Sequence, residues 1–189
     1  MRRGSAPAGA AEEGRRLAPY GRALLNWYDA HRRLLPWRLD AAPYRVWVSE
    51  IMLQQTRIEA VLPYFDRFMR QLPTIRDLAA CGEDRLLKLW EGLGYYSRAR
   101  NLQKAARVIL EQYGGEMPGD YEALLGLPGI GEYTAGAVAS ISFGIPVPAV
   151  DGNVMRVLAR LTANGEDILR PAAKRWFTAA AAAMLPPEA

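Results

Sequence analysis

The chain reads LLGLPGIGEYTAGAVASISF over residues 124–143, and this stretch decides the fold. Its centre, LPGIG at 127–131, is a tight turn in which the proline stops the preceding helix and the two glycines permit positive φ. The next helix is predicted to begin at Glu132, so its unpaired amides and positive dipole end lie against the turn, where they suit a phosphate oxygen. The residues of the turn that we expect to contact a phosphate backbone are Leu127, Gly129, Ile130 and Gly131.

By itself LPGIG favours an ordinary turn between two helices, which is the alternative interpretation. The small residues at 135–137 and 139 shift the balance, because they let the two helices approach closely enough to fix the turn as a hairpin. We therefore interpret 124–143 as a phosphate-binding helical hairpin.

The composition is that of a globular protein. Half of the 189 residues are apolar and 10% are aromatic, which allows one large domain or two small ones with a real core. The net charge is only +4, but the basic residues are almost all arginines, the exceptions being Lys88, Lys104 and Lys174. Arginine is the cation favoured on phosphate, so the bias mildly supports a nucleic-acid partner, although an arginine-rich genome would produce it too.

Several kinds of site are excluded by the residue counts. Cys81 is the only cysteine, which excludes an intramolecular disulfide and a cysteine-based metal cluster within this chain, and His31 cannot form a metal site alone. No apolar run approaches the roughly 20 residues that span a bilayer, and the N-terminus lacks the apolar core of a signal peptide. We expect a cytoplasmic protein with no membrane partner. Residues 1–16, small and charged, predict a disordered leader.

From residue 17 onward the pattern predicts helices almost throughout, because apolar residues recur every three or four positions and glycine or proline separates the segments. No segment alternates long enough to predict a sheet, so the expected fold class is all-α. The stretch 145–150, with two prolines, is expected to connect two helical lobes. The predicted helices are 17–31, 43–55, 57–71, 74–80, 84–91, 95–113, 120–126, 132–143, 152–163 and 171–184.

Two carboxylates are candidates for catalysis. Asp151, in AVDGNVMRV, follows the hairpin closely, and Glu50 lies in PYRVWVSEIMLQQT. On a helix, the neighbours of Glu50 at three and four positions are mostly apolar, and desolvation among them would raise its pKa, as a general acid at neutral pH needs. The alternative is a boundary glutamate paired with Arg45 or Arg57.

The same predicted helix ends in a polar segment. Amide side chains there can meet base edges or fill an opened base stack, whereas simple solvation of the glutamines is the alternative. The residues of this segment are Leu53, Gln54, Gln55 and Thr56.

Four motifs occur in order: SEIMLQQT, LWEGLGYYSRARNL, LPGIGEYTAGA and VDGNVMRVLAR. Together they resemble the MutY type of adenine DNA glycosylase, of the helix-hairpin-helix glycosylase superfamily, from about residue 27 to 160. The resemblance implies a six-helix lobe over 36–145, which carries the hairpin at 127–131. It also implies a second lobe, incomplete here, formed by an N-terminal helix at 17–35 and by residues 146–189.

The resemblance implies a base-excision-repair enzyme that hydrolyses the N-glycosidic bond of adenine mispaired with 8-oxoguanine or guanine in double-stranded DNA. Such enzymes flip the adenosine out of the duplex. Glu50 matches the acid that protonates adenine N7, and Asp151 matches the carboxylate that stabilises the oxocarbenium-like sugar, as in retaining glycosidases. Asn153 matches the residue that orients this carboxylate, and Tyr133 matches a tyrosine that acts in the transition state. Trp37 and Arg38 match residues of the adenine pocket. Leu53, Gln55 and Tyr95 match residues that enter the base stack. For one of Tyr95 and Tyr96, core packing is the alternative.

Relatives of the endonuclease III type carry a lysine where this chain has Tyr133, and that amine forms the Schiff base of strand cleavage. The resemblance therefore favours a monofunctional glycosylase, which we expect to be a monomer, over a bifunctional glycosylase and lyase.

Family members usually continue into a four-cysteine loop that holds a 4Fe-4S cluster and into a domain that reads 8-oxoguanine. Neither is found in this sequence, so we expect a truncated chain that lacks the cysteine ligands of the cluster. A cation at the hairpin beside DNA phosphate is also compatible with the resemblance. The five alanines at 179–183 are expected to supply little apolar bulk to the second lobe. A DNA-binding fragment without turnover is the alternative function.

Overall fold

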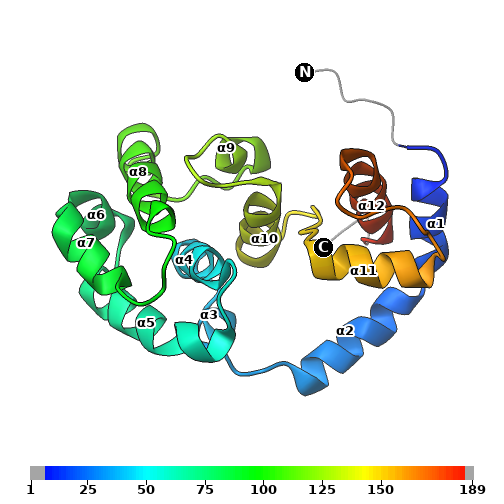
Figure 1. Ribbon diagram of the computed structural model, residues 1–189, viewed down its shortest axis with the longest axis horizontal. Coiled ribbons are helices and arrows are strands. Elements are labelled where there is room, and N and C mark those ends of the chain that lie inside the picture. Colours follow the sequence, from blue (N-terminus) through cyan, green and yellow to red (C-terminus); the bar gives the residue numbers. More distant parts are fainter. Residues whose placement is uncertain (1–6, 186–189) are drawn as a thin grey trace. The chain divides into compact units, whose positions relative to one another are not determined.

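The computed structural model describes residues 7–185, and in that range every regular element is an α-helix (Figure 1). This confirms the predicted all-α class. No helix among the described residues is long and apolar enough to cross a membrane. The chain forms two compact units: one comprises residues 35–143, and the other comprises the described parts of 1–34 and 144–189.

The unit of residues 35–143 contains eight helical segments, two of which, α3 and α9, are short turns of four and five residues. The six longer helices and α9 correspond to the seven helices that the periodicity predicts in this unit, and α3 is the one segment that it does not predict. The segments are α3 (Pro36–Leu39), α4 (Pro43–Leu53), α5 (Ile58–Gln71), α6 (Ile75–Ala80), α7 (Glu83–Trp90), α8 (Ser97–Gln112), α9 (Tyr121–Leu125) and α10 (Glu132–Phe143).

Helix α4 is the centre of this unit. Trp47, Val48 and Met52 are completely buried, and the helix contacts α5, α8 and α10, which surround it in Figure 1. A helix that is apolar on most of its circumference has to be buried, and α4 has no solvent-facing polar stripe apart from residues near its ends and Glu50. The segment that carries Glu50 is therefore fixed by the core, while Glu50 itself is half-buried.

The second unit contains four helices in its described residues: α1 (Ala10–Leu17), α2 (Tyr20–His31), α11 (Gly152–Leu161) and α12 (Pro171–Met184). Its apolar core gathers around Leu17, Leu158, Ala173 and Phe177. Residues 144–151, which precede α11, are not helical, and Gly144 ends α10 with a φ of 65°.

The prediction of a disordered leader at 1–16 is wrong from residue 10 onward, while residues 1–6 lie outside the described part. Ala10, Gly14 and Leu17 form one buried face of α1, which packs against α12. A Cβ at Gly14 would lie 2.2 Å from the carbonyl oxygen of Ala180, so the two backbones approach closely. The small residues that look disordered in the sequence are those that permit this approach.

The helix predicted at 17–31 begins three residues later, at Tyr20, and ends at His31 as predicted. Helix α1 ends at Leu17 and α2 begins at Tyr20, with Pro19 between them as the N-cap of α2. A proline lacks the amide hydrogen that a continuous helix would need and is tolerated at a helix start, so the chain restarts there. Residues 32–34 follow α2 without helical structure.

Candidate functional site

The turn between α9 and α10 occupies residues 126–131, which contain the turn predicted at 127–131. Ile130 N donates to the carbonyl of Leu127 (3.1 Å), and Ala135 N donates to the carbonyl of Gly131 (2.9 Å), so α10 begins directly after the turn. The side chains of Leu127 and Ile130 are only 4% and 5% exposed. Both residues therefore anchor the turn in the core, and contact of the turn with a DNA backbone stays a prediction.

The two glycines of the turn differ. Gly129 has a φ of 76°, and a Cβ there would lie 2.7 Å from the Cβ of Asn101 on α8. Gly131 does not have a positive φ, and a Cβ there would meet nothing within 4 Å. Of the two glycines that permit a positive φ, only Gly129 adopts one. The fold therefore requires glycine at position 129, whereas position 131 can accept another small residue without a clash within the chain.

Glu50 lies half-buried on α4. The residues four and three positions before it, Val46 and Trp47, are 1% and 0% exposed, and Ile51 beside it is 4% exposed. The structure thus places this carboxylate at the edge of an apolar core, as its helical neighbours predict.

Beyond Glu50, α4 ends at Leu53, and Gln55 adopts a φ of 59°. Gln55 is exposed, while Leu53, Gln54 and Thr56 are half-buried. A left-handed conformation at a residue other than glycine is uncommon and persists only where the surrounding structure holds it. This segment, residues 53–56, is hereafter the first loop.

A second strained residue follows α7. Tyr95 has a φ of 45° and is 63% exposed, and Tyr96 is 39% exposed. Core packing, the alternative considered for one of these tyrosines, therefore applies to neither. Residues 93–96 are hereafter the second loop. Both loops that carry predicted DNA-contacting side chains thus contain a left-handed residue with a large side chain.

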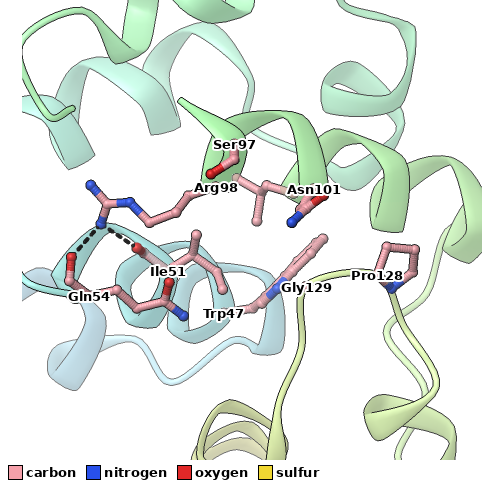
Figure 2. A pocket seen from close by; sticks show the side chains of 9 residues that line it. Trp47, Ile51, Gln54, Ser97, Arg98, Asn101, Pro128 and Gly129 are labelled. Atoms are coloured by element: carbon pink, nitrogen blue, oxygen red, sulfur yellow. Dashed lines mark hydrogen bonds between the residues drawn. The ribbon is translucent and has the colours of Figure 1, made fainter. Parts of the chain in front are cut away.

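Arg98, which is not among the predicted site residues, connects the two loops. Arg98 is 9% exposed, and its side chain donates five hydrogen bonds to backbone carbonyls. Figure 2 shows those to Ile51 and Gln54. The acceptors of Nη1 are Ile51 (2.9 Å), Met52 (3.0 Å) and Gln54 (2.6 Å), and those of Nη2 are Leu93 (3.0 Å) and Gly94 (3.2 Å). Burial lowers the pKa of Arg98, but arginine starts so far above neutrality that the guanidinium stays charged.

One sequence signal could have revealed this residue. Arg98 lies four positions before Leu102 and eight before Ala106, both of which are buried on α8. An arginine on the apolar stripe of a helix must find acceptors inside the protein, because an unpaired buried charge is costly.

A cavity of about 240 Å³ lies beside these loops, between the end of α4, the start of α8 and the hairpin (Figure 2). Gln54 and Gly129 both line it, together with Asn101. The structure therefore brings the first loop and the hairpin, which are more than 70 positions apart in the sequence, to one place.

Asp151 lies in the other unit, as the N-cap of α11. Its Oδ1 accepts from the amides of Asn153 (2.9 Å) and Val154 (2.8 Å), and its Oδ2 accepts from Asn153 Nδ2 (2.8 Å). Asn153 Oδ1 in turn accepts from Arg156 Nη2. The carboxylate is half-buried and has one orientation fixed by three donors. Asn153 thus contacts Asp151 as the sequence predicts, and Arg156 extends the network beyond that prediction.

The remaining predicted site residues are in the unit of residues 35–143. Tyr133, the second residue of α10, is 37% exposed, and Arg38 on α3 is half-buried. Trp37 is only 5% exposed and packs edge-on against Phe65, with 5.0 Å between ring centroids. Trp37 is thus a core residue, and its place beside an adenine pocket stays a prediction.

The residues of this chain do not fit an iron-sulfur cluster, which needs four cysteine thiolates. Cys81 is buried, and its thiol donates to the carbonyl of Gly82 (3.4 Å). Among the described residues, no three side chains of His, Cys, Asp or Glu are grouped so that they could hold a metal ion.

Comparison with protein families identifies a match over residues 48–179 to the model described as HhH-GPD superfamily base excision DNA repair protein. That range contains Glu50, both loops, the hairpin and Asp151. The match covers more than two thirds of the chain.

Curated relatives carry the name adenine DNA glycosylase. The protein of Homo sapiens is 51% identical over 154 residues, which are 77% of this chain and 28% of the relative. The protein of Rattus norvegicus is 50% identical over 157 residues, 78% of this chain and 30% of the relative. The protein of Mycolicibacterium smegmatis is 43% identical over 166 residues, 87% of this chain and 56% of the relative. The chain thus spans roughly a third to a half of the length of such relatives.

Solved structures with the same fold include a thermostable thymine-DNA glycosylase, with a TM-score of 0.74 and 26% identity, over 91% of this chain and 86% of that one. A trapped covalent intermediate of endonuclease III with DNA has a TM-score of 0.70 and 25% identity, over 90% of this chain and 84% of that one.

Proposed function

Because the chain belongs to the HhH-GPD superfamily of base excision DNA repair proteins, we propose that it is a DNA glycosylase that removes adenine mispaired with 8-oxoguanine or guanine. The observation that carries this proposal is the identity of 43–51% with proteins named adenine DNA glycosylase over most of this chain. Such an enzyme works where the chromosome is, which in a bacterium is the cytoplasm.

In the proposed complex, the hairpin holds the DNA backbone. The exposed glycines Gly129 and Gly131, together with the positive dipole end of α10, suit a phosphate oxygen. These contacts position the duplex without reading its sequence. A cation at the hairpin beside the same phosphate stays a prediction.

The chemistry requires the adenosine to leave the base stack, because the glycosidic bond is inaccessible inside the duplex. We assign the first and second loops, with Leu53, Gln55 and Tyr95, to the opened stack and the opposite base. Glu50 protonates adenine N7, which turns the base into a better leaving group, and then assists the attacking water. Arg38 contributes to the adenine pocket.

Asp151 offsets the positive charge that develops on the sugar as the bond breaks. Its three donors hold the carboxylate in one orientation before the reaction starts, so little reorganisation is needed in the transition state. Asn153 orients this carboxylate, and Tyr133 stabilises the transition state.

The experiment that tests the proposal is single-turnover incubation with a duplex containing adenine opposite 8-oxoguanine, followed by alkali to cleave at abasic sites. Strand breakage after alkali is expected. Binding of the duplex without any abasic product would instead identify the chain as a DNA-binding fragment without turnover.

The strands should remain intact until alkali is added, and borohydride should trap no covalent complex with DNA. A Schiff base needs an amine where Tyr133 stands, and a phenol cannot form one. Denaturing gel electrophoresis with and without borohydride distinguishes the outcomes. A borohydride-dependent band would show that the chain is a bifunctional glycosylase and lyase.

The two hairpin glycines are expected to respond differently to alanine. Gly129→Ala should lower Tm, because the added Cβ would be strained at this positive φ and would lie too close to Asn101. Together these effects should lower the free energy of unfolding by about 1–3 kcal/mol. Gly131→Ala should leave Tm unchanged but weaken binding to all duplexes alike, since the added methyl group would face the phosphate. Thermal unfolding and titration with matched and mispaired duplexes measure both effects. An affinity loss confined to one base pair would contradict a phosphate contact at the hairpin.

A further inference from the structure

The two loops that we assign to the opened base stack share an unusual feature. Gln55 in the first loop and Tyr95 in the second each adopt a left-handed backbone conformation, with φ values of 59° and 45°. Such conformations are unfavourable for residues other than glycine and persist where neighbouring groups over-determine them. What holds these two backbones therefore decides where the Gln55 and Tyr95 side chains can reach.

A single guanidinium holds both. Nη1 of Arg98 donates hydrogen bonds to three carbonyls at the end of α4, just before Gln55. Nη2 donates to two carbonyls of the second loop, just before Tyr95. The first loop is more than 40 positions away from Arg98 in the sequence, so no local structure links the two loops in this way. The guanidinium also lies over the Tyr95 ring, 5.5 Å from its centroid.

We propose that Arg98 is a positioning residue that sets the discrimination between opposite bases, by holding the first and second loops at a fixed separation. The proposal rests on the proposed function, because it concerns which mispair is processed. Arg98 itself is buried and need not touch DNA.

The chemistry of arginine fits this task better than that of lysine. Its planar fork directs two nitrogen atoms to two separate sets of acceptors, whereas an ammonium group presents three donors from one point. A positive charge also suits the C-terminal end of α4, where helix carbonyls lack internal partners. The Nε atom is buried without a hydrogen-bond partner, a cost that a residue serving only to fill space would avoid.

The test compares Arg98→Lys and Arg98→Met with a control on the same helix. Gln103 is also buried, at 5% exposure, and its Nε2 donates to the carbonyls of Leu78 (3.2 Å) and Cys81 (2.6 Å), which belong to neither loop. Gln103→Met therefore removes buried hydrogen bonds between an α8 side chain and backbone carbonyls, as the Arg98 variants do, but leaves both loops unchanged. All three variants are expected to lower Tm.

Single-turnover excision rates are measured for adenine opposite 8-oxoguanine, guanine and cytosine. Misplacement of a positioning group by about 1 Å can cost up to about 100-fold in rate. We expect the ratio of the 8-oxoguanine rate to the cytosine rate to fall about tenfold in both Arg98 variants, by the same reasoning. The ratio should stay at the wild-type value in Gln103→Met. A ratio that changes equally in all three variants, or in none, overturns the proposal.

Amide hydrogen exchange of the free protein supplies a readout that does not depend on excision. In both Arg98 variants, the amides of the first and second loops should exchange faster than in the wild type. In Gln103→Met, faster exchange should be confined to residues around 78–82. Faster exchange in one loop alone would show that Arg98 does not couple them, which overturns the proposal. If the wild-type chain excises adenine from no duplex, the proposed function fails and this discrimination role fails with it, while the exchange pattern still decides whether Arg98 holds the loops.

Discussion

Glu50→Gln is expected to slow adenine excision by about 10²–10⁴-fold, the usual contribution of a general acid, while binding of the mispaired duplex changes little. The amide keeps the size and shape of the side chain but cannot donate the proton to adenine N7. Because α4 is fixed by its contacts with α5, α8 and α10, the substitution should not move the loop that follows it. Single-turnover rates and duplex titrations measure the two effects separately.

The control for this prediction is Glu111→Gln, which makes the same chemical change at an exposed carboxylate on α8. It should leave both the rate and the affinity unchanged. A Glu50→Gln variant that excises adenine at nearly the wild-type rate would remove Glu50 from the mechanism.

Asp151→Asn is expected to reduce the excision rate by about 10²–10³-fold, the typical loss when one preorganised group that stabilises transition-state charge is removed. Asparagine is as good an N-cap as aspartate, so α11 should keep its cap and Tm should change little. The loss of negative charge, rather than unfolding, would then explain the lower rate. Excision kinetics and thermal unfolding of the same preparation test this.

The chain offers a matched control and a contrasting variant. Asp120 caps α9 by accepting from the amide of Ala123 (2.8 Å), so Asp120→Asn repeats the substitution at a second N-cap and should leave excision unchanged. Asp151→Ala should lose the cap as well as the charge, with a further cost of about 0.5–2 kcal/mol in the free energy of unfolding. An Asp151→Asn variant with full activity would show that the capping role of Asp151 is its only one.

Helix positions in the unit of residues 35–143 followed from the sequence because their causes are local. The helix predicted at 132–143 has those bounds, and the one predicted at 57–71 begins one residue later, at Ile58. Apolar spacing, prolines and glycines act within a few residues of the positions that they affect, so they can be interpreted without knowing what the helix packs against.

The N-terminal region shows where that approach fails. Residues 10–17 are poor in large apolar groups, and the alanines at 179–183 were expected to contribute little bulk. In the structure, Gly14 and Ala180 let α1 and α12 approach closely, while Phe177 supplies the bulk of that core. Small residues stabilise a helix pair by permitting backbone approach, which depends on the partner and not on the helix itself.

The sequence by itself determined the all-α class, the helix boundaries around the hairpin and the identity of the two candidate carboxylates, because these are written in local spacing and in short motifs. Only the tertiary structure showed that glycine is required at 129 and not at 131, and that Leu127 and Ile130 are buried. It alone showed that Arg98 joins the two loops. Each of these depends on contacts between residues far apart in the chain. Such contacts exist only once the helices have packed, so no local pattern specifies them.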